Sequence, residues 1–288
     1  MSSLTLPASI VSTNWLSQYL GQASLKVVDA STYLPNAGRD AKAEYLAAHV
    51  PGALFADIGW LSEAAAPYPH TLLSERDFAD RMGSLGISND DAVVVYDGSG
   101  QNFSAPRLWW MLRVFGHRNV AVLDGGIRKW MADGYAVDTE LPAITPTNFS
   151  AKLDASRLRN MADVRANVGS HAEQTLDARS AGRFQGTEPE PRPGVRGGHI
   201  PGSVNIHYAS VVNEDGTLRS PNEIRAIVAN AGLDTTRPIV ASCGTGITAC
   251  AVVLALDSIG VNDVAVFDGS WTEWGSSTDT PIETGAAH

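Results

Sequence analysis

The chain has 288 residues, which is long for one domain and sufficient for two domains of ordinary size. Apolar residues make up 44% and charged residues 18%, as in soluble globular proteins, and no apolar run approaches the length of a membrane span. The 21 lysines and arginines against 31 acidic residues give a net charge of −10, which argues against binding to nucleic acids or anionic membranes. Any anion site must therefore be a local basic pocket.

The cysteines and the N-terminal segment bear on the compartment. Two cysteines in a chain of this length do not make a disulfide framework. Cys243 and Cys250 stand seven positions apart without a Cys or His cluster at ligand spacing, so no metal site is expected. The opening "MSSLTLPASIVSTNWL" lacks the basic and apolar regions of a signal peptide. We therefore expect a cytoplasmic protein.

In the first half of the chain, short β-branched runs alternate with helical stretches. The runs predict strands over 25–30, 91–97 and 119–125, and the stretch "SAPRLWWMLRVFG" predicts a helix over 104–116 because its apolar residues recur every three to four positions.

The second half shows the same alternation. Strands are predicted over 174–179, 237–242 and 263–269, and helices over 221–232 and 248–260. Ser220 before "PNEIRAIVANAG" supplies an N-cap, followed by a proline in the first turn and a closing glycine.

The two halves match one another in four stretches that occur in the same order. "VVDAS" matches "TLDARS", "HVPGALFADI" matches "HIPGSVNIHY", "VVVYDGSG" matches "IVASCGTG", and "VAVLDGGIRKW" matches "VAVFDGSWTEW", at offsets of 144 to 150 residues. Offsets that change so little indicate loop insertions within one topology. His49 and His199 precede Pro-Gly in both copies, so a structural role in the turn explains them better than catalysis.

These patterns predict an α/β protein with two tandem domains. Each domain is expected to have a mainly parallel sheet with helices on both faces. The proline-containing stretch "DTELPAITPTNFSAKLD" lacks a sustained period and marks the boundary. The first domain is predicted over 1–140, a linker over 141–154 and the second domain over 155–288.

The loop "SCGTGITAC" is where the two copies differ chemically. Cys243 aligns with Asp97 when "YDGSG" is placed under "SCGTG". A strand that turns through Gly244 and Gly246 into a helix presents backbone N–H groups to an anion. A carboxylate fills such a cradle as a fixed internal anion, whereas a thiol there has its thiolate form stabilised. The first copy is therefore predicted to be structural and the second reactive.

A cysteine in the position of Cys243 can serve several chemistries. An unpaired cysteine is most often a buried small apolar residue, which is the better account of Cys250, but the end of a parallel strand is where open α/β sheets bind ligands. A cysteine phosphatase needs Cys-x5-Arg, and Ala249 stands at the arginine position. A cysteine protease needs a nearby histidine base, which no spacing in the sequence supports.

The tandem halves, the paired "H-V/I-P-G" turns, "GRFQGTEPEPR" and above all "CGTGITAC" resemble the two-domain rhodanese superfamily. The resemblance covers nearly the whole chain, from "VVDASTYLP" to "DGSWTEW". Its mercaptopyruvate branch carries Cys-Gly-Ser-Gly-Val-Thr in the loop, whereas thiosulfate enzymes carry basic residues directly after the cysteine. Gly244 and Thr245 stand there in this chain, so the match is to the mercaptopyruvate branch.

The resemblance implies two rhodanese-like domains and a sulfurtransferase. Cys243 would bear a persulfide, 3-mercaptopyruvate would donate the sulfur, and thioredoxin, a small thiol or cyanide would accept it, without any metal or organic cofactor. The residues that match the substrate-binding arginines and the catalytic loop are Arg183, Arg192, Gly244, Thr245, Gly246, Ile247 and Thr248. The competing interpretation of the arginines is that they pair with Glu188 and Glu190 on a solvated loop.

The chain departs from the family pattern in two places. Thr245 replaces the loop serine of a proposed Ser-His-Asp relay, and keeps the hydroxyl. His70 in "PYPH" matches the relay histidine, but Asp57-Ile58-Gly59 stands where Asp-Ile-Asp is frequent, so the relay carboxylate is missing. Two other functions stay open: a thiosulfate-preferring transferase, and a sensor module whose cysteine is oxidised or persulfidated and then read by a partner.

Overall fold

The computed structural model describes residues 4–34 and 37–287, which form two units. Unit 1 consists of Met1–Ala64, Leu72–Asp154 and Val212–Leu218. Unit 2 consists of Ala65–Thr71, Ala155–Val211 and Arg219–His288.

Unit 1 alternates strands and helices along the chain, as the hydrophobic pattern predicts. Its elements are β1 Ile10–Val11, α1 Thr13–Tyr19, β2 Leu25–Asp29, α2 Ala41–Ala47, β3 Leu54–Phe55, α3 Glu75–Ser84, β4 Ala92–Tyr96, α4 Ala105–Val114, β5 Val120–Leu123 and α5 Gly126–Ala132.

Unit 2 repeats this order with two added 3-10 turns. Its elements are η1 Ala155–Arg157, β6 Leu158–Arg159, α6 Met161–Ser170, β7 Gln174–Asp177, α7 Ala181–Gln185, β8 Val204–Asn205, η2 Tyr208–Val211, α8 Pro221–Asn230, β9 Ile239–Ser242, α9 Ala249–Ser258, β10 Val264–Phe267 and α10 Ser270–Ser276. The predicted N-cap of α8 is present, because the Ser220 side chain and Glu223 form a reciprocal capping box.

Over the described residues, each unit has one five-stranded sheet in which every pairing of neighbouring strands is parallel. The strand orders are β1-β5-β4-β2-β3 and β6-β10-β9-β7-β8, so the two sheets have the same topology. The central strands β4 and β9 are buried at every position, which explains their continuous β-branched and apolar composition. The predicted α/β fold with a repeated parallel sheet is confirmed.

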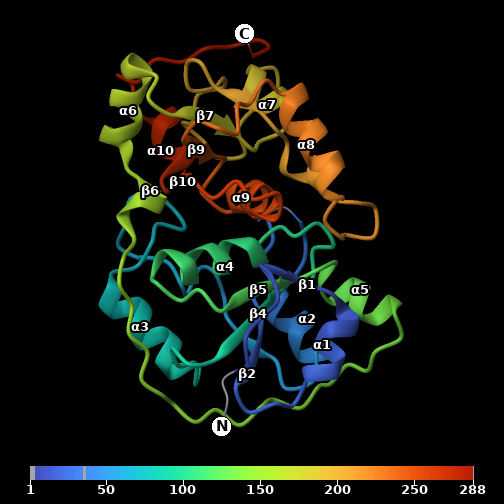
Figure 1. Ribbon diagram of the computed structural model, residues 1–288. Helices are drawn as coiled ribbons and strands as arrows, with labels where there is room; N and C mark the ends of the chain where they lie inside the picture. The colour runs from blue at the N-terminus through green and yellow to red at the C-terminus, as the bar shows by residue number, and fades with distance from the viewer. Residues whose placement is uncertain (1–3, 35–36, 288) are drawn as a thin grey trace. The chain divides into compact units, whose positions relative to one another are not determined.

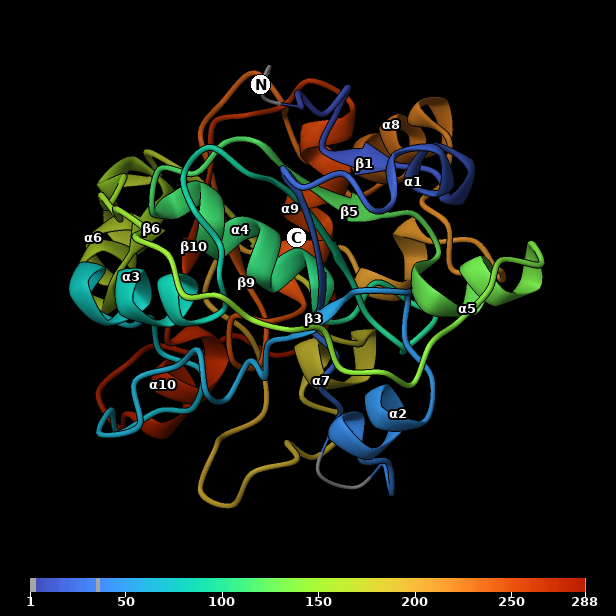
Figure 2. The ribbon, with the colours of Figure 1, turned by 90° about the horizontal axis from the view of Figure 1, so that it is seen from below.

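Helices cover both faces of each sheet (Figure 1). In unit 1, α1 and α5 pack on one face with Tyr45 of α2, and α3 and α4 lie on the other; the view in Figure 2 separates the same two groups. In unit 2, α6 and α10 pack on one face through Val164, Phe267 and Trp271, and α8 and α9 contact each other on the opposite face. The predicted helical tryptophans Trp109, Trp110, Trp130 and Trp274 are all core residues, each at most 2% exposed.

Two short segments each belong to the opposite unit from the one that their position in the sequence repeat predicts. Residues 65–71, from the first half of the sequence, are part of unit 2, and residues 212–218, from the second half, are part of unit 1. The two segments lie 147 positions apart, as repeated elements do. In unit 1, the amide of Asn102 donates to the carbonyl of Gly216, and the N–H of Leu218 donates to Asp124.

The stretch 141–154, predicted as a linker, lies along unit 1. The N–H of Thr147 donates to the carbonyl of Gly83, and the N–H of Ser150 donates to the side chain of Asn89. Gly83 is required at this close approach, because a Cβ there would lie 2.5 Å from the carbonyl oxygen of Thr147. The boundaries at 140 and 154 stay a prediction.

Within the described part of the chain, none of the helices combines the length and the apolar character that crossing a bilayer requires.

Candidate active site

Cys243 lies directly after β9, at the carboxyl end of a buried parallel strand. Its side chain is almost fully buried, and its backbone N–H donates to the hydroxyl of Ser270 over 3.1 Å. The carbonyl of Cys243 accepts from the N–H of Trp271. The backbone of Cys243, the nucleophile predicted from the sequence, is therefore held by hydrogen bonds at both its N–H and its carbonyl group.

In unit 1 the equivalent loop is filled by its own carboxylate. One oxygen of Asp97 accepts from the N–H and hydroxyl of Ser99, and the other accepts from the N–H groups of Ser104 and Ala105 at 2.9 and 2.8 Å. This is the fixed internal anion expected from the sequence. The first N–H groups of α4 are thereby satisfied by a group within the loop.

In unit 2 the loop has no such carboxylate, and it is two residues shorter. The N-cap of α9 is Thr248, five positions after Cys243, whereas Ser104 caps α4 seven positions after Asp97. Among the described residues, no hydrogen-bond acceptor is found for the backbone N–H groups of Gly244, Thr245, Ile247 or Thr248. Gly246 turns the loop with a φ of 78°, a conformation that favours glycine. The loop therefore offers unfilled donors and a helix N-terminus to an anion beside Cys243.

His70 lies beside this loop, as the resemblance to the family implies. Its Nδ1 is 2.9 Å from the hydroxyl oxygen of Thr245, and both residues belong to unit 2 because residues 65–71 do. Asp57, the remaining part of the family's relay motif, is exposed and accepts from the N–H groups of Gly59 and Trp60 in its own turn. The structure thus brings together the histidine and the hydroxyl.

The two predicted arginines differ in their partners. Arg183, in α7, forms a bidentate ion pair with Glu190 through Nη2 and Nε, at 2.6 and 3.2 Å. A Cβ on Gly244 would lie 3.1 Å from Nη2 of Arg183, so the guanidinium borders the cysteine loop. Arg192 is partly buried and makes no hydrogen bond or ion pair with residues 4–34 or 37–287. Burial, and then the charge of Arg183, lower the pKa of Arg192, whereas Cys243 and Glu190 raise it.

The family model described as "Rhodanese-like domain" matches residues 12–133 and 160–277. The chain belongs to the rhodanese family.

Among known rhodanese relatives, the chain is 45% identical to the 3-mercaptopyruvate sulfurtransferase of Rattus norvegicus over 279 residues, covering 95% of this chain and 94% of that one. It is 47% identical to the thiosulfate sulfurtransferase of Cricetulus griseus over 272 residues, covering 92% and 91%. The crystal structure of SseA from Escherichia coli, a 3-mercaptopyruvate sulfotransferase, superposes with a TM-score of 0.84 at 36% identity, covering 92% of this chain and 99% of that one. The chain is thus an enzyme of sulfur transfer.

Several residues around the rhodanese loop were missed by sequence reasoning. Arg179 and Trp271 stand where the first copy has Ser31 and Ile127, so comparing the halves position by position would have found them. Ser270 stands where the first copy has Gly126 and binds the N–H of Cys243. His207 is half-buried, and burial followed by the charge of Arg183 lowers its pKa.

Other sequence candidates of this rhodanese are structural, as expected. His49 and His199 are buried, and each ring donates from Nδ1 to a backbone carbonyl, that of Tyr45 and that of Phe184 respectively. Cys250 is fully buried in α9. Turn and core packing account for these residues.

Proposed function

We propose that the enzyme takes sulfur from 3-mercaptopyruvate, carries it as a persulfide on Cys243, and passes it to a thiol acceptor such as thioredoxin or to cyanide, releasing pyruvate. The unfilled loop beside Cys243 supports this most directly, because the matching loop of unit 1 already holds the carboxylate of Asp97. In the first copy the N–H groups of the loop are therefore occupied by a carboxylate, whereas in the second copy they can bind an anionic sulfur species.

In the first half-reaction, the thiolate of Cys243 attacks the sulfur of the donor and forms an S–S bond. The C–S bond breaks, its electron pair goes to carbon as the enolate of pyruvate, and a proton completes pyruvate. The hydroxyl of Thr245, hydrogen-bonded to His70 at 2.9 Å, is the proton relay that the site offers. The N–H groups after Cys243 stabilise the negative charge of the sulfur.

Arg183 and Arg192 are the proposed anchors of the donor. Arg183 uses one edge of its guanidinium for Glu190 and keeps Nη1, while Arg192 has no partner among the described residues. Planar guanidinium groups suit a carboxylate next to a keto oxygen. These groups also supply the local positive charge that a chain of net charge −10 needs in order to bind an anion.

In the second half-reaction, the thiolate of the acceptor attacks the outer sulfur of the persulfide. The S–S bond breaks, the acceptor keeps the outer sulfur, and Cys243 leaves as a thiolate that starts the next cycle. With cyanide the product is thiocyanate. No step calls for a metal or an organic cofactor, and a cytoplasmic location for this chemistry is part of the proposal.

A thiosulfate-preferring transferase is the second candidate. It is favoured by the 47% identity to the Cricetulus griseus thiosulfate sulfurtransferase. Against it, Gly244 and Thr245 place no basic side chain directly after Cys243 to face a doubly charged donor.

The decisive experiment mixes the purified enzyme with 3-mercaptopyruvate or thiosulfate, and follows pyruvate release and the mass of the peptide that contains Cys243. We expect Cys243 to gain one sulfur atom with stoichiometric pyruvate, and to gain little from thiosulfate. Cys243→Ser should fold normally and gain none, since oxygen does not hold a persulfide.

Two other outcomes are informative. Wild-type turnover in Cys243→Ser would overturn the mechanism. A Cys243 that gains no sulfur from either donor would favour a sensor module, in which the thiol is modified slowly and read by a partner.

A further inference from the structure

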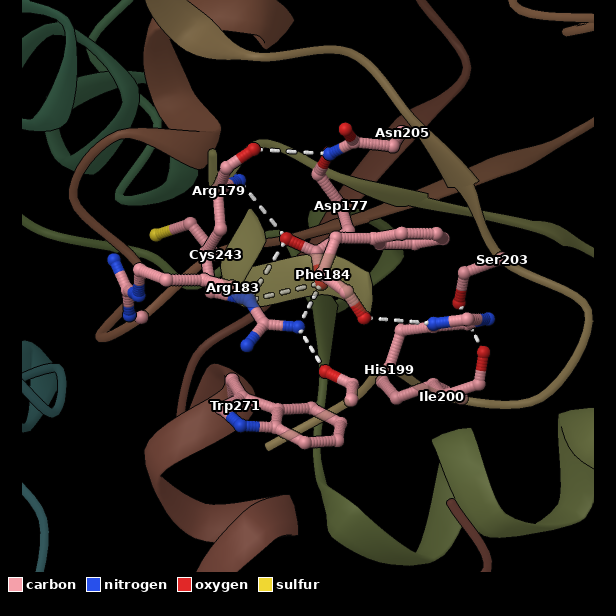
Figure 3. Close-up of polar contacts among 12 residues, drawn as sticks. Asp177, Arg179, Arg183, Phe184, His199, Ile200, Ser203, Asn205, Cys243 and Trp271 are labelled. Atoms are coloured by element: carbon pink, nitrogen blue, oxygen red, sulfur yellow. Dashed lines mark hydrogen bonds and ion pairs between the residues drawn. The ribbon is translucent and has the colours of Figure 1, made fainter. Parts of the chain in front are cut away.

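In unit 2, Arg183 is joined to a buried chain of ion pairs. Arg179, whose side chain is 0% exposed, binds Asp177 at 2.5 Å and Glu190 at 2.7 Å. Glu190, whose side chain is 4% exposed, then binds Arg183 at 2.6 Å. The guanidinium of Arg179 also stacks on the ring of Trp271, 4.3 Å from its centroid, and Figure 3 shows this stack together with Arg183 beside Cys243.

This chain of contacts joins the two sides of the cysteine loop. The N–H of Trp271 donates to the carbonyl of Cys243, and Trp271 supports Arg179. Glu190 connects Arg179 to Arg183, which borders the loop at Gly244. The position of the anchor arginine is thus set by the same group of residues that holds the backbone of the nucleophile.

The first copy of the domain keeps the aspartate of this network without its arginine. Asp29 matches Asp177, but Ser31 stands in the place of Arg179. Burial raises the pKa of Asp29 to about 6, so this carboxyl is poorly stabilised as an anion. The ion-pair chain therefore accompanies the reactive cysteine and is not a general requirement of the fold.

Within this network, Glu190 is the carboxylate whose charge acts on both arginines proposed to bind the sulfur donor, Arg183 and Arg192. It binds Arg179 and Arg183 directly, and its charge acts on Arg192 against the repulsion from Arg183. Removing this charge leaves Arg179 paired with Asp177, and leaves Arg183 and Arg192 without an ion pair among the described residues. The site would then attract a dianion more strongly, relative to a monoanion, than it does with Glu190 ionised.

We infer that Glu190 is a positioning residue that also selects the donor: it holds Arg183 beside the cysteine loop, and its negative charge favours a singly charged α-keto acid thiol over doubly charged thiosulfate. This inference rests on the proposed function, because it concerns the choice between the two donors at that same site.

The test compares Glu190→Gln with Glu188→Gln, since Glu188 is exposed and accepts a hydrogen bond from the hydroxyl of Ser180. Steady-state kinetics are measured with 3-mercaptopyruvate and with thiosulfate, using cyanide as acceptor. For Glu190→Gln we expect KM for 3-mercaptopyruvate to rise about tenfold, and the ratio of the two kcat/KM values to move about tenfold toward thiosulfate. Glu188→Gln should keep both values within about twofold of wild type, as expected for an exposed carboxylate.

A second variant separates charge from position. Glu190→Asp keeps the negative charge on a side chain that is one methylene shorter and no longer reaches Arg183 and Arg179 together. We expect its KM for 3-mercaptopyruvate to rise as well, but its donor ratio to stay that of wild type. Should Glu190→Gln not fold, an unchanged KM in a folded Glu190→Asp would by itself overturn the positioning role.

The outcomes also separate this inference from the proposed function. If wild type releases no pyruvate from 3-mercaptopyruvate, the proposed function fails. If wild type does so and Glu190→Gln keeps the wild-type donor ratio, the donor-selecting role of Glu190 is wrong while the proposed function stands.

Discussion

Arg192 differs from Arg179 and Arg183 because it forms no ion pair or hydrogen bond with residues in the described ranges. Burial, and then the charge of its neighbour Arg183, lower the pKa of Arg192, so the two positive charges repel each other until an anion enters. A carboxylate that binds both groups removes this repulsion and gains charge-assisted hydrogen bonds.

We therefore expect Arg192→Ala to raise KM for 3-mercaptopyruvate by about 10-fold to 100-fold, which corresponds to the loss of one hydrogen bond between charged groups. The rise for thiosulfate should be smaller, because thiosulfate has no carboxylate. Arg225→Ala, which removes an exposed arginine of α8, is the matched control and should behave as wild type. Equal effects of Arg192→Ala on both donors would show that Arg192 does not anchor the carboxylate.

At this scale the sequence predicts residues that sit in a recognisable motif and misses those that act through burial. Cys243 follows a strand and precedes glycines, so its environment is legible from the sequence. Arg179, in contrast, stands out in the sequence only as a difference between the two halves, because nothing in "TLDARS" indicates that its guanidinium is fully buried and paired with Asp177 and Glu190. Glu190 looked like a surface partner, and only packing shows that its side chain is enclosed.

At the scale of secondary-structure elements, the first residue of α10 fixes the end of β9. Ser270 has a φ of 50°, in the left-handed region that non-glycine residues rarely adopt, and its counterpart Gly126 has a φ of 59°. The hydroxyl of Ser270 accepts from the N–H of Cys243 and donates to the carbonyl of Phe267. The strained conformation is therefore retained together with two hydrogen bonds of the Ser270 hydroxyl, one to Cys243 and one to Phe267.

Replacing Ser270 tests this balance between strain and hydrogen bonding. Ser270→Ala keeps the strain and loses both bonds, whereas Ser270→Gly loses the bonds and relieves the strain. We expect Ser270→Gly to be more stable than Ser270→Ala by about 1 kcal/mol in urea unfolding, and both to turn over several-fold more slowly than wild type. A glycine variant no more stable than the alanine variant would mean that this backbone conformation carries no strain.

At the scale of the whole molecule, Asp29 makes stability depend on pH. Its folded-state pKa of about 6, raised by burial and further by the charge of Asp97, exceeds the value of about 3.9 for an unfolded chain. The folded protein thus holds this proton more tightly, so the contribution of Asp29 to the free energy of unfolding falls as pH rises from about 4 to about 6.

Asp29→Asn should remove this contribution. The variant is expected to match wild type near pH 4 and to be more stable by about 2–3 kcal/mol above pH 7, the amount that a shift of this size implies. Urea unfolding of both proteins between pH 4 and pH 8 measures the difference. A difference that does not change with pH would contradict the raised pKa.

The overall architecture was predictable because a repeat shows the same pattern twice. The strand and helix positions, the parallel sheets and the filling of the first loop by the carboxylate of Asp97 all follow from aligning the two halves. The places of residues 65–71 and 212–218 do not follow, since a repeat predicts that each copy keeps its own segments. The unit to which each segment belongs depends on tertiary contacts, such as the hydrogen bonds of Asn102 and Asp124 to residues 212–218.

These exchanged segments constrain how the polypeptide can be divided. A gene split after residue 154 would encode a first fragment without residues 212–218 and a second without residues 65–71, which carry His70. Neither fragment would contain a whole unit, so we expect the second fragment alone to lose the contact of His70 with Thr245. Each unit thus contains a segment that is encoded in the other half of the sequence.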